Sequence, residues 1–138
     1  MQSRIWDTAS EKERTGFSFA LVVEEVANFR NSVMAHLRQR GWLVHGTNGA
    51  EEALRLLAHI PYSLIVLDSE LAGMGGIDFV RMLQNSREWP PLRIVVINSS
   101  TRPSLPSRVG ESGAFLASKS SWEIDLFEFL AAQEGVST

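Results

Sequence analysis

The sequence contains no cysteine, which excludes disulfide frameworks and thiolate metal sites. It has no apolar run approaching the ~20 residues of a transmembrane helix, and its N-terminal residues lack the apolar core of a signal peptide. The formal net charge of −3 offers no basic field for nucleic acid or an anionic membrane. We therefore expect a cytoplasmic protein that contacts neither nucleic acid directly nor a membrane.

The chain has the size and composition of one globular domain. Its 138 residues are 44% hydrophobic and 21% charged, which is ordinary for a protein with a single core. Residues 1–16 are polar and charged, with Trp6 as their only tryptophan, and they predict a flexible N-terminal leader. The folded domain is expected at 17–134 and a short C-terminal tail at 135–138.

Apolar runs and helical patterns alternate along the domain. Near-continuous apolar runs, each predicted to be a strand, occupy 17–23, 42–45, 62–67, 92–97 and 114–117. Helical spacing of apolar residues covers 29–38, 53–60, 77–88 and 122–130, with turn residues at 46–49. This order is typical of a parallel sheet covered on both faces. It predicts the α/β class, with a doubly wound five-stranded parallel sheet, flavodoxin-like order 2-1-3-4-5 and helices on both faces.

One connection departs from this pattern. The segment 99–113 contains Pro103 and Pro106 and has only Leu105 and Val109 to face a core. Because proline confines a helix to a late start, we expect a short or partly irregular fourth helix.

Polar residues follow the predicted strands at their carboxyl ends, where open parallel sheets form their sites. They are Glu24 and Glu25 after the first strand, Asp68 after the third, Asn98 and Ser99 after the fourth, and Lys119 after the fifth. Three close carboxylates repel one another unless a cation lies among them. Oxygen ligands without Cys or His indicate Mg²⁺ rather than zinc. The lysine suits a partner to a phosphoryl oxygen.

With these residues the chain resembles the receiver domain of two-component response regulators over roughly 17–134. The motifs are LVVEE at 21–25, LIVLDSELAGMGGIDF at 64–79 and SGAFLASK at 112–119. The resemblance implies that Asp68 is a phosphoacceptor, phosphorylated by a histidine kinase or phosphotransfer protein. The chain would assist its own phosphoryl transfer and hydrolysis rather than act as an enzyme. A downstream protein target and a homodimer through the fourth helix, fifth strand and last helix are also implied.

The resemblance assigns a role to each site residue. Glu24, Glu25 and Asp68 would bind Mg²⁺ together with the backbone carbonyl of Glu70. Lys119 would contact the phosphoryl group, and Asn98 lies where the family usually has Ser or Thr for that purpose. Ser99 would replace Asn98 if the loop shifts by one residue.

Several positions depart from the family pattern. The family usually has Asp-Asp or Glu-Asp in place of Glu24–Glu25, proline in place of Ala72, and a cis-proline in place of Ser120. Because a cis bond before a non-proline residue costs about 2.5–4 kcal/mol, we predict a trans Lys119–Ser120 bond. The resemblance also implies an aromatic residue that gates the output face, formed by the fourth helix, fifth strand and last helix; here it would be Phe115 or would be lost to Leu116. An alternative interpretation is a degenerate receiver that acts as a phosphorylation-independent protein-interaction module.

The same residues also permit interpretations without phosphoryl chemistry. Asp68 could be a solvated carboxylate capping its loop, Lys119 its ion-pair partner, and Glu24–Glu25 an acidic helix start. An FMN-binding protein would need a phosphate loop where the two glutamates stand, and a cobalamin module would need histidine at Glu70. Three histidines lie away from this site and are predicted to be surface or hydrogen-bonded core residues: His36, His45 and His59.

Overall fold

The computed structural model describes residues 18–71, 74–85, 92–98 and 114–133. Its strands are β1 (Phe19–Val23), β2 (Leu43–Thr47), β3 (Leu64–Asp68), β4 (Arg93–Asn98) and β5 (Phe115–Ser118). Its α-helices are α2 (Ala27–Arg38), α3 (Ala50–Leu57), α4 (Gly76–Asn85) and α6 (Trp122–Gln133), and a 3₁₀ turn, η1, spans Lys119–Ser121. All neighbouring strands pair in parallel, in the order β2-β1-β3-β4-β5. The predicted fold class and strand order are confirmed.

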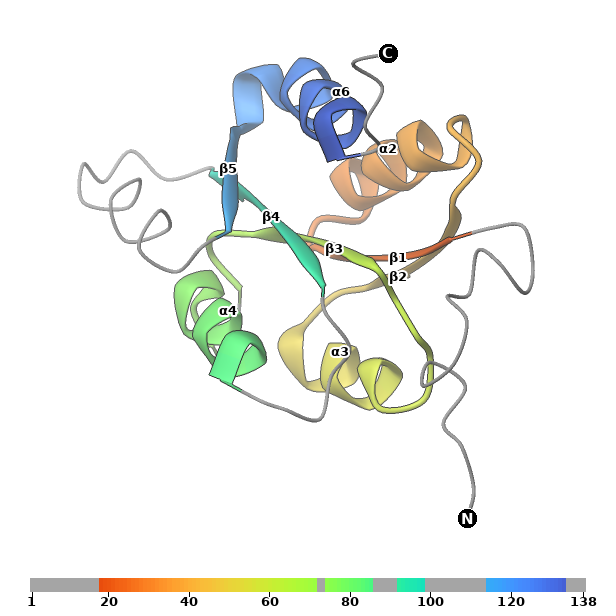
Figure 1. Ribbon diagram of the computed structural model, residues 1–138. Helices are drawn as coiled ribbons and strands as arrows, with labels where there is room; N and C mark the ends of the chain where they lie inside the picture. Colours follow the sequence, from red (N-terminus) through yellow and green to blue (C-terminus); the bar gives the residue numbers. More distant parts are fainter. Residues whose placement is uncertain (1–17, 72–73, 86–91, 99–113, 134–138) are drawn as a thin grey trace.

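The sheet separates two apolar layers. Helices α3 and α4 cover one face and helices α2 and α6 cover the other (Figure 1). Alternate residues of one strand serve opposite layers, so Leu21 and Val23 face α3 and α4 while Ala20 and Val22 face the other side. Because both faces are covered, the central strand β3 is buried along its whole length.

Strand β2 is longer than the sequence predicts. Gly46 and Thr47, expected in a turn, continue the strand and pair with Val22 and Val23 of β1. The absence of a side chain at Gly46 leaves room for Met34 of α2, which lies where a Cβ would be. The turn prediction was therefore wrong for these two residues, because pairing with β1 outweighs their local preference for turns.

Two of the three histidines match their prediction. His45 Nδ1 lies 2.7 Å from the Tyr62 hydroxyl, within hydrogen-bond distance, and His59 is exposed. The burial of Tyr62 raises its pKa to about 12. His45 is thus hydrogen-bonded to a core tyrosine and is not a candidate metal ligand.

His36 differs. Its Nε2 is buried and has no hydrogen-bond partner among the described residues, while its ring meets Trp122 edge-on at 5.3 Å between centroids. Burial lowers the pKa of His36, as does the charge of Arg40, and Glu123 opposes this shift. The prediction of a surface or hydrogen-bonded histidine was wrong here, because α6 covers one side of the ring.

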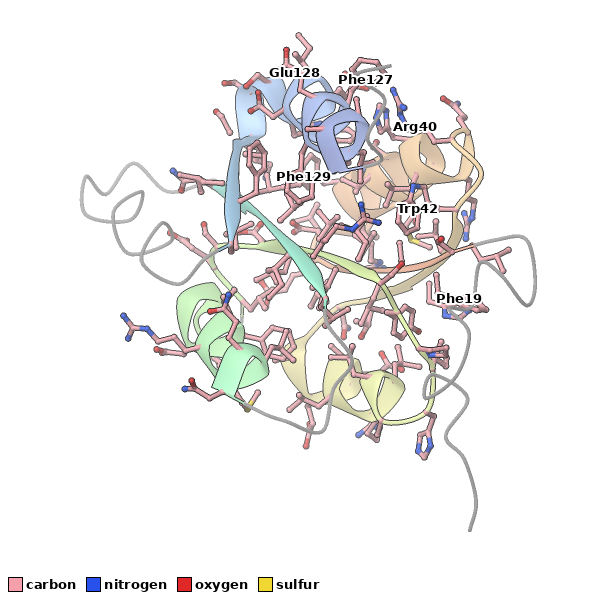
Figure 2. The ribbon with its side chains drawn as sticks, viewed as in Figure 1. Phe19, Arg40, Trp42, Phe127, Glu128 and Phe129 are labelled. Carbon is pink, nitrogen blue, oxygen red and sulfur yellow. The ribbon has the colours of Figure 1, made fainter. Side chains whose placement is uncertain are left out.

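Helix α6 carries one aromatic residue on its outer side and another on its inner side. Phe127 is exposed and lies under the Arg40 guanidinium at 4.1 Å, whereas Phe129 points toward the sheet and stacks on Phe115 (Figure 2). Phe115 packs in the layer of α2 and α6, and Leu116 packs against the opposite layer. The two alternatives for the gating aromatic thus lie on different faces of the sheet.

Several predictions fall outside the described residues: the leader at 1–16, the tail at 135–138, the fourth connection at 99–113, and Ala72. In the part of the chain that is described, no helix has both the length and the apolar character needed to cross a membrane.

Candidate functional site

Asp68 ends the central strand at the carboxyl edge of the sheet. The apolar residues before it bury the strand, and Asp68 as a whole is only 7% exposed. Its Oδ1 accepts a hydrogen bond of 2.8 Å from the backbone N–H of Glu70. This bond turns the chain sharply behind the carboxylate and holds it at the mouth of the sheet.

Glu24 lies on the neighbouring strand end and is also buried, at 4% exposure. Its carboxylate accepts a 3.0 Å hydrogen bond from the Val26 backbone, and its own backbone N–H donates to the Thr47 carbonyl at 2.9 Å. The Arg30 guanidinium donates to the Glu24 carbonyl at 2.6 Å. Three contacts therefore fix the loop between β1 and α2 with Glu24 turned inward.

Glu24 and Asp68 form a close acidic pair. The two side chains lie within hydrogen-bonding reach, so Glu24 can donate to Asp68 when its carboxyl is protonated. Burial raises the pKa of Glu24 to about 7, the bond and charge of Asp68 add to the shift, and the Val26 amide and Lys119 oppose it. A buried pair of this kind holds a proton near neutral pH unless a cation replaces it.

Glu25 is oriented differently from its neighbour. Its side chain is exposed and borders a hollow of about 570 Å³ beside Asn48 and the start of α3. Among the described residues, no three His, Cys, Asp or Glu side chains gather closely enough to form a metal-binding group. The structure thus brings Glu24 and Asp68 together but does not gather Glu25 with them.

Lys119 opens the 3₁₀ turn after β5. The Ser118 hydroxyl caps this turn by accepting from the Ser120 backbone N–H at 3.4 Å, and Asp125 accepts from the Ser118 N–H at 3.0 Å. No described peptide bond is cis, so the predicted trans bond before Ser120 is confirmed. The exposed ammonium of Lys119 lies 4.6 Å from the ring centroid of Phe29 on α2.

Asn98 ends β4, is half-buried and pairs with Ser118 in the strand register. Glu70 is exposed, and its backbone N–H points to Asp68. Ser99 lies outside the described residues. The roles of Asn98, Ser99 and the Glu70 carbonyl remain predictions.

Comparison with known proteins identifies the family of this arrangement. The model of the response regulator receiver domain matches residues 20–118. The chain belongs to this family. The receiver domain is 35% identical over 75 residues to the two-component response regulator PhoP of Pseudomonas aeruginosa, a match that covers 54% of this chain and 33% of that protein. The chain spans less than half the length of the curated relatives it matches.

Solved structures share the receiver fold. A response regulator receiver protein from Pseudomonas putida is 25% identical with a TM-score of 0.76, and the alignment covers 84% of this chain and 97% of that one. A response regulator protein from Burkholderia pseudomallei, solved with a phosphorylated aspartic acid, calcium ion and citrate, is 19% identical with a TM-score of 0.70. That alignment covers 88% of this chain and 75% of that one.

The receiver site also depends on residues that the sequence did not single out. A Cβ at Gly76 would lie 2.6 Å from the Asp68 carbonyl oxygen and 2.9 Å from Ser69 Cα, so α4 can start this close only with glycine. Arg30 and Phe29 act on the site from the first turn of α2. The helical spacing marked Phe29 only as a core residue, and no local signal distinguishes Arg30 from other surface arginines.

Proposed function

We propose that this receiver domain accepts a phosphoryl group on Asp68 from a histidine kinase or phosphotransfer protein. The observation that supports it most directly is the acidic pair of Glu24 and Asp68 at the carboxyl edge of the sheet, with Lys119 near enough to oppose the pKa shift of Glu24. The hydrogen bond from the Glu70 backbone N–H fixes the orientation of the buried Asp68 carboxylate at this edge.

In the proposed transfer, an Asp68 oxygen attacks the phosphorus of a phosphohistidine in line. The new O–P bond forms as the P–N bond breaks, and the histidine nitrogen keeps the electron pair and takes a proton from water. The Lys119 ammonium and the Asn98 amide offset charge on the transferred oxygens. Hydrolysis of the acyl phosphate returns Asp68, so the chain is a phosphoacceptor that assists its own reactions and not an enzyme with a separate substrate.

The donor atoms of the site suit a hard divalent cation such as Mg²⁺. The Glu24 and Asp68 carboxylates and the Glu70 carbonyl would hold it, with Glu25 nearby, and Mg²⁺ usually keeps several waters and needs only one or two carboxylates. When bound, the ion would neutralise charge on the phosphoryl oxygens. The raised pKa of Glu24 supports this assignment, because a cation would relieve the repulsion that the shared proton now relieves.

The proposed setting is the cytoplasm, and the proposed partners are the phosphodonor protein and a downstream protein target. The relatives are longer than the matched region, so the similarity does not identify a target or a homodimer for this chain. We include in the proposal a downstream target and a homodimer through β5 and α6.

The test is phosphorylation by a small donor. We expect acetyl phosphate and Mg²⁺ to add one phosphoryl group to the wild-type chain, seen by intact mass, and Asp68→Asn to add none. Glu128→Gln, which changes an exposed carboxylate on α6, serves as a matched acidic control and should retain the adduct. No adduct on the wild type, together with no Mg²⁺ binding by calorimetry, would contradict the proposal and support the interaction module instead.

A further inference from the structure

The Lys119 side chain is held at an aromatic face on a helix that is distant in sequence. Its ammonium lies 4.6 Å from the ring centroid of Phe29, within the range of a cation–π contact. Lysine is a flexible side chain with high rotamer entropy, and Lys119 is exposed. A fixed ring beside the ammonium therefore favours the Lys119 rotamers that keep the ammonium at the ring.

The ring of Phe29 is itself held. Trp122, buried at the start of α6, meets it edge-on at 5.7 Å with an interplanar angle of 84°. Trp122 directly follows the 3₁₀ turn that begins with Lys119, so the same turn supplies both the cation and the residue that orients the ring. Phe29 lies one residue before Arg30, which binds the Glu24 carbonyl.

These contacts join both sides of the site. The α2 turn that fixes Glu24 also presents the ring to Lys119, and the turn after β5 presents Lys119 to the ring. The ammonium consequently stays close enough to influence the Glu24 carboxyl. An exposed cation–π contact is weak enough to yield to a phosphoryl oxygen.

We propose that Phe29 is a positioning residue that holds the Lys119 ammonium on the side of the site where Glu24 and Asp68 form their acidic pair, before phosphorylation. This inference rests on the proposed function, in which Lys119 receives the phosphoryl oxygens. Phe29 does not touch the reacting atoms and acts only through Lys119.

The lysine content of the chain makes a direct test practical. Lys12 and Lys119 are the only two lysines, so lysine labelled with ¹³C gives two ε-methylene signals in an NMR spectrum. We expect the Lys119 signal, assigned with Lys119→Arg, to be shifted upfield by the ring current of Phe29. Phe29→Leu removes the ring but keeps an apolar side chain, and should return the signal to the position of an unrestrained lysine. Phe29→Tyr keeps the ring and should preserve the shift.

Phosphorylation is the second readout on the same variants. The rate with acetyl phosphate should fall about twofold to fivefold in Phe29→Leu and should stay near wild type in Phe29→Tyr. Phe127→Leu is the matched control, because it removes a cation–π contact with Arg40 elsewhere on α6. It should change neither the Lys119 signal nor the rate, and circular dichroism would confirm that each variant is folded.

The two readouts separate the possible failures. An unshifted Lys119 signal in the wild type, or one that persists in Phe29→Leu, would overturn the role of Phe29 whatever the phosphorylation result. A shifted signal with an unchanged Phe29→Leu rate would also overturn it. Absence of any phosphoryl adduct on wild type would instead refute the proposed function, while the NMR shift would still report the contact.

Discussion

At the scale of single residues, two adjacent glutamates have different environments. Glu24 is buried within hydrogen-bonding reach of Asp68, while Glu25 is exposed at the surface. Adjacent residues that leave a strand tend to point to opposite sides, but the sequence does not say which one points inward. The inward position belongs to Glu24 because its carboxylate accepts from the Val26 amide and its carbonyl accepts from Arg30.

The burial of Glu24 predicts a pH dependence of stability. Its pKa is about 7 in the folded chain against an ordinary value of 4.5, so the native state binds more protons between these values. Stability from this group is fully present below pH 4.5 and is lost as pH rises through 7. Glu24→Gln, which can still donate to Asp68, should therefore raise the free energy of unfolding at pH 8 by about 1–3 kcal/mol in metal-free buffer.

Urea unfolding at pH 4.5 and pH 8 measures this effect. Glu24→Gln should match the wild type at the lower pH and exceed it at the higher pH. Glu25→Gln is the control, since its side chain is exposed, and should follow the wild type at both. A wild-type pH profile that survives in Glu24→Gln would show that Glu24 does not carry the proton.

At the scale of elements, the contact between β3 and α4 decides how Asp68 is presented. The N–H of Gly76 donates to the Ser69 carbonyl at 3.1 Å, so the first residue of α4 closes the loop behind the acceptor. The sequence predicted a helix near 77 from its apolar spacing. That spacing did not reveal the close approach of Gly76 to the backbone of Asp68 and Ser69, because the approach is created by segments that are brought together in the fold.

Gly76→Ala should damage this contact. The added Cβ would meet backbone atoms of Asp68 and Ser69 at 2.6–2.9 Å, and backbone cannot move aside as a flexible side chain can. We expect a loss of about 1–3 kcal/mol in unfolding free energy and slower phosphorylation of Asp68. Denaturant unfolding and acetyl phosphate labelling measure the two effects.

Gly75→Ala provides the comparison for that experiment. The nearest atom to its added Cβ would be Asp78 Oδ2 at 3.7 Å, an ordinary contact. This variant should unfold close to wild type. Equal midpoints for the two alanine variants would contradict the close-approach explanation.

At the scale of the whole molecule, the sheet places all of its polar strand ends at one edge. The strand order brings Asp68 of the central strand between the ends of β1 and β4. The buried acidic pair at this edge opposes stability at neutral and alkaline pH, so a cation that binds the folded chain should stabilise the entire domain.

We therefore expect Mg²⁺ to raise the unfolding temperature of the wild type at pH 8. At a hundred times its dissociation constant, the ion contributes about 2.7 kcal/mol by mass action, which corresponds to several degrees for a domain of this size. Scanning fluorimetry with and without MgCl₂ measures the shift, and NaCl at equal ionic strength controls for screening. Asp68→Asn should lose most of the shift; an equal shift in that variant would place the cation elsewhere.

The sequence by itself determined the fold class, the strand order and the position of the carboxylates at the strand ends. These follow from local patterns, because apolar runs and helical spacing specify which segments must be buried on both faces. It also correctly predicted the trans bond before Ser120, which depends only on the residue type after Lys119.

Only the tertiary structure decided which groups meet at the site. It paired Glu24 rather than Glu25 with Asp68, placed Gly76 against the acceptor backbone, extended β2 through Thr47 and set Lys119 over Phe29. Each of these contacts joins residues from different elements, and side-chain direction there is determined by packing of one element on another. Local sequence carries no record of that packing.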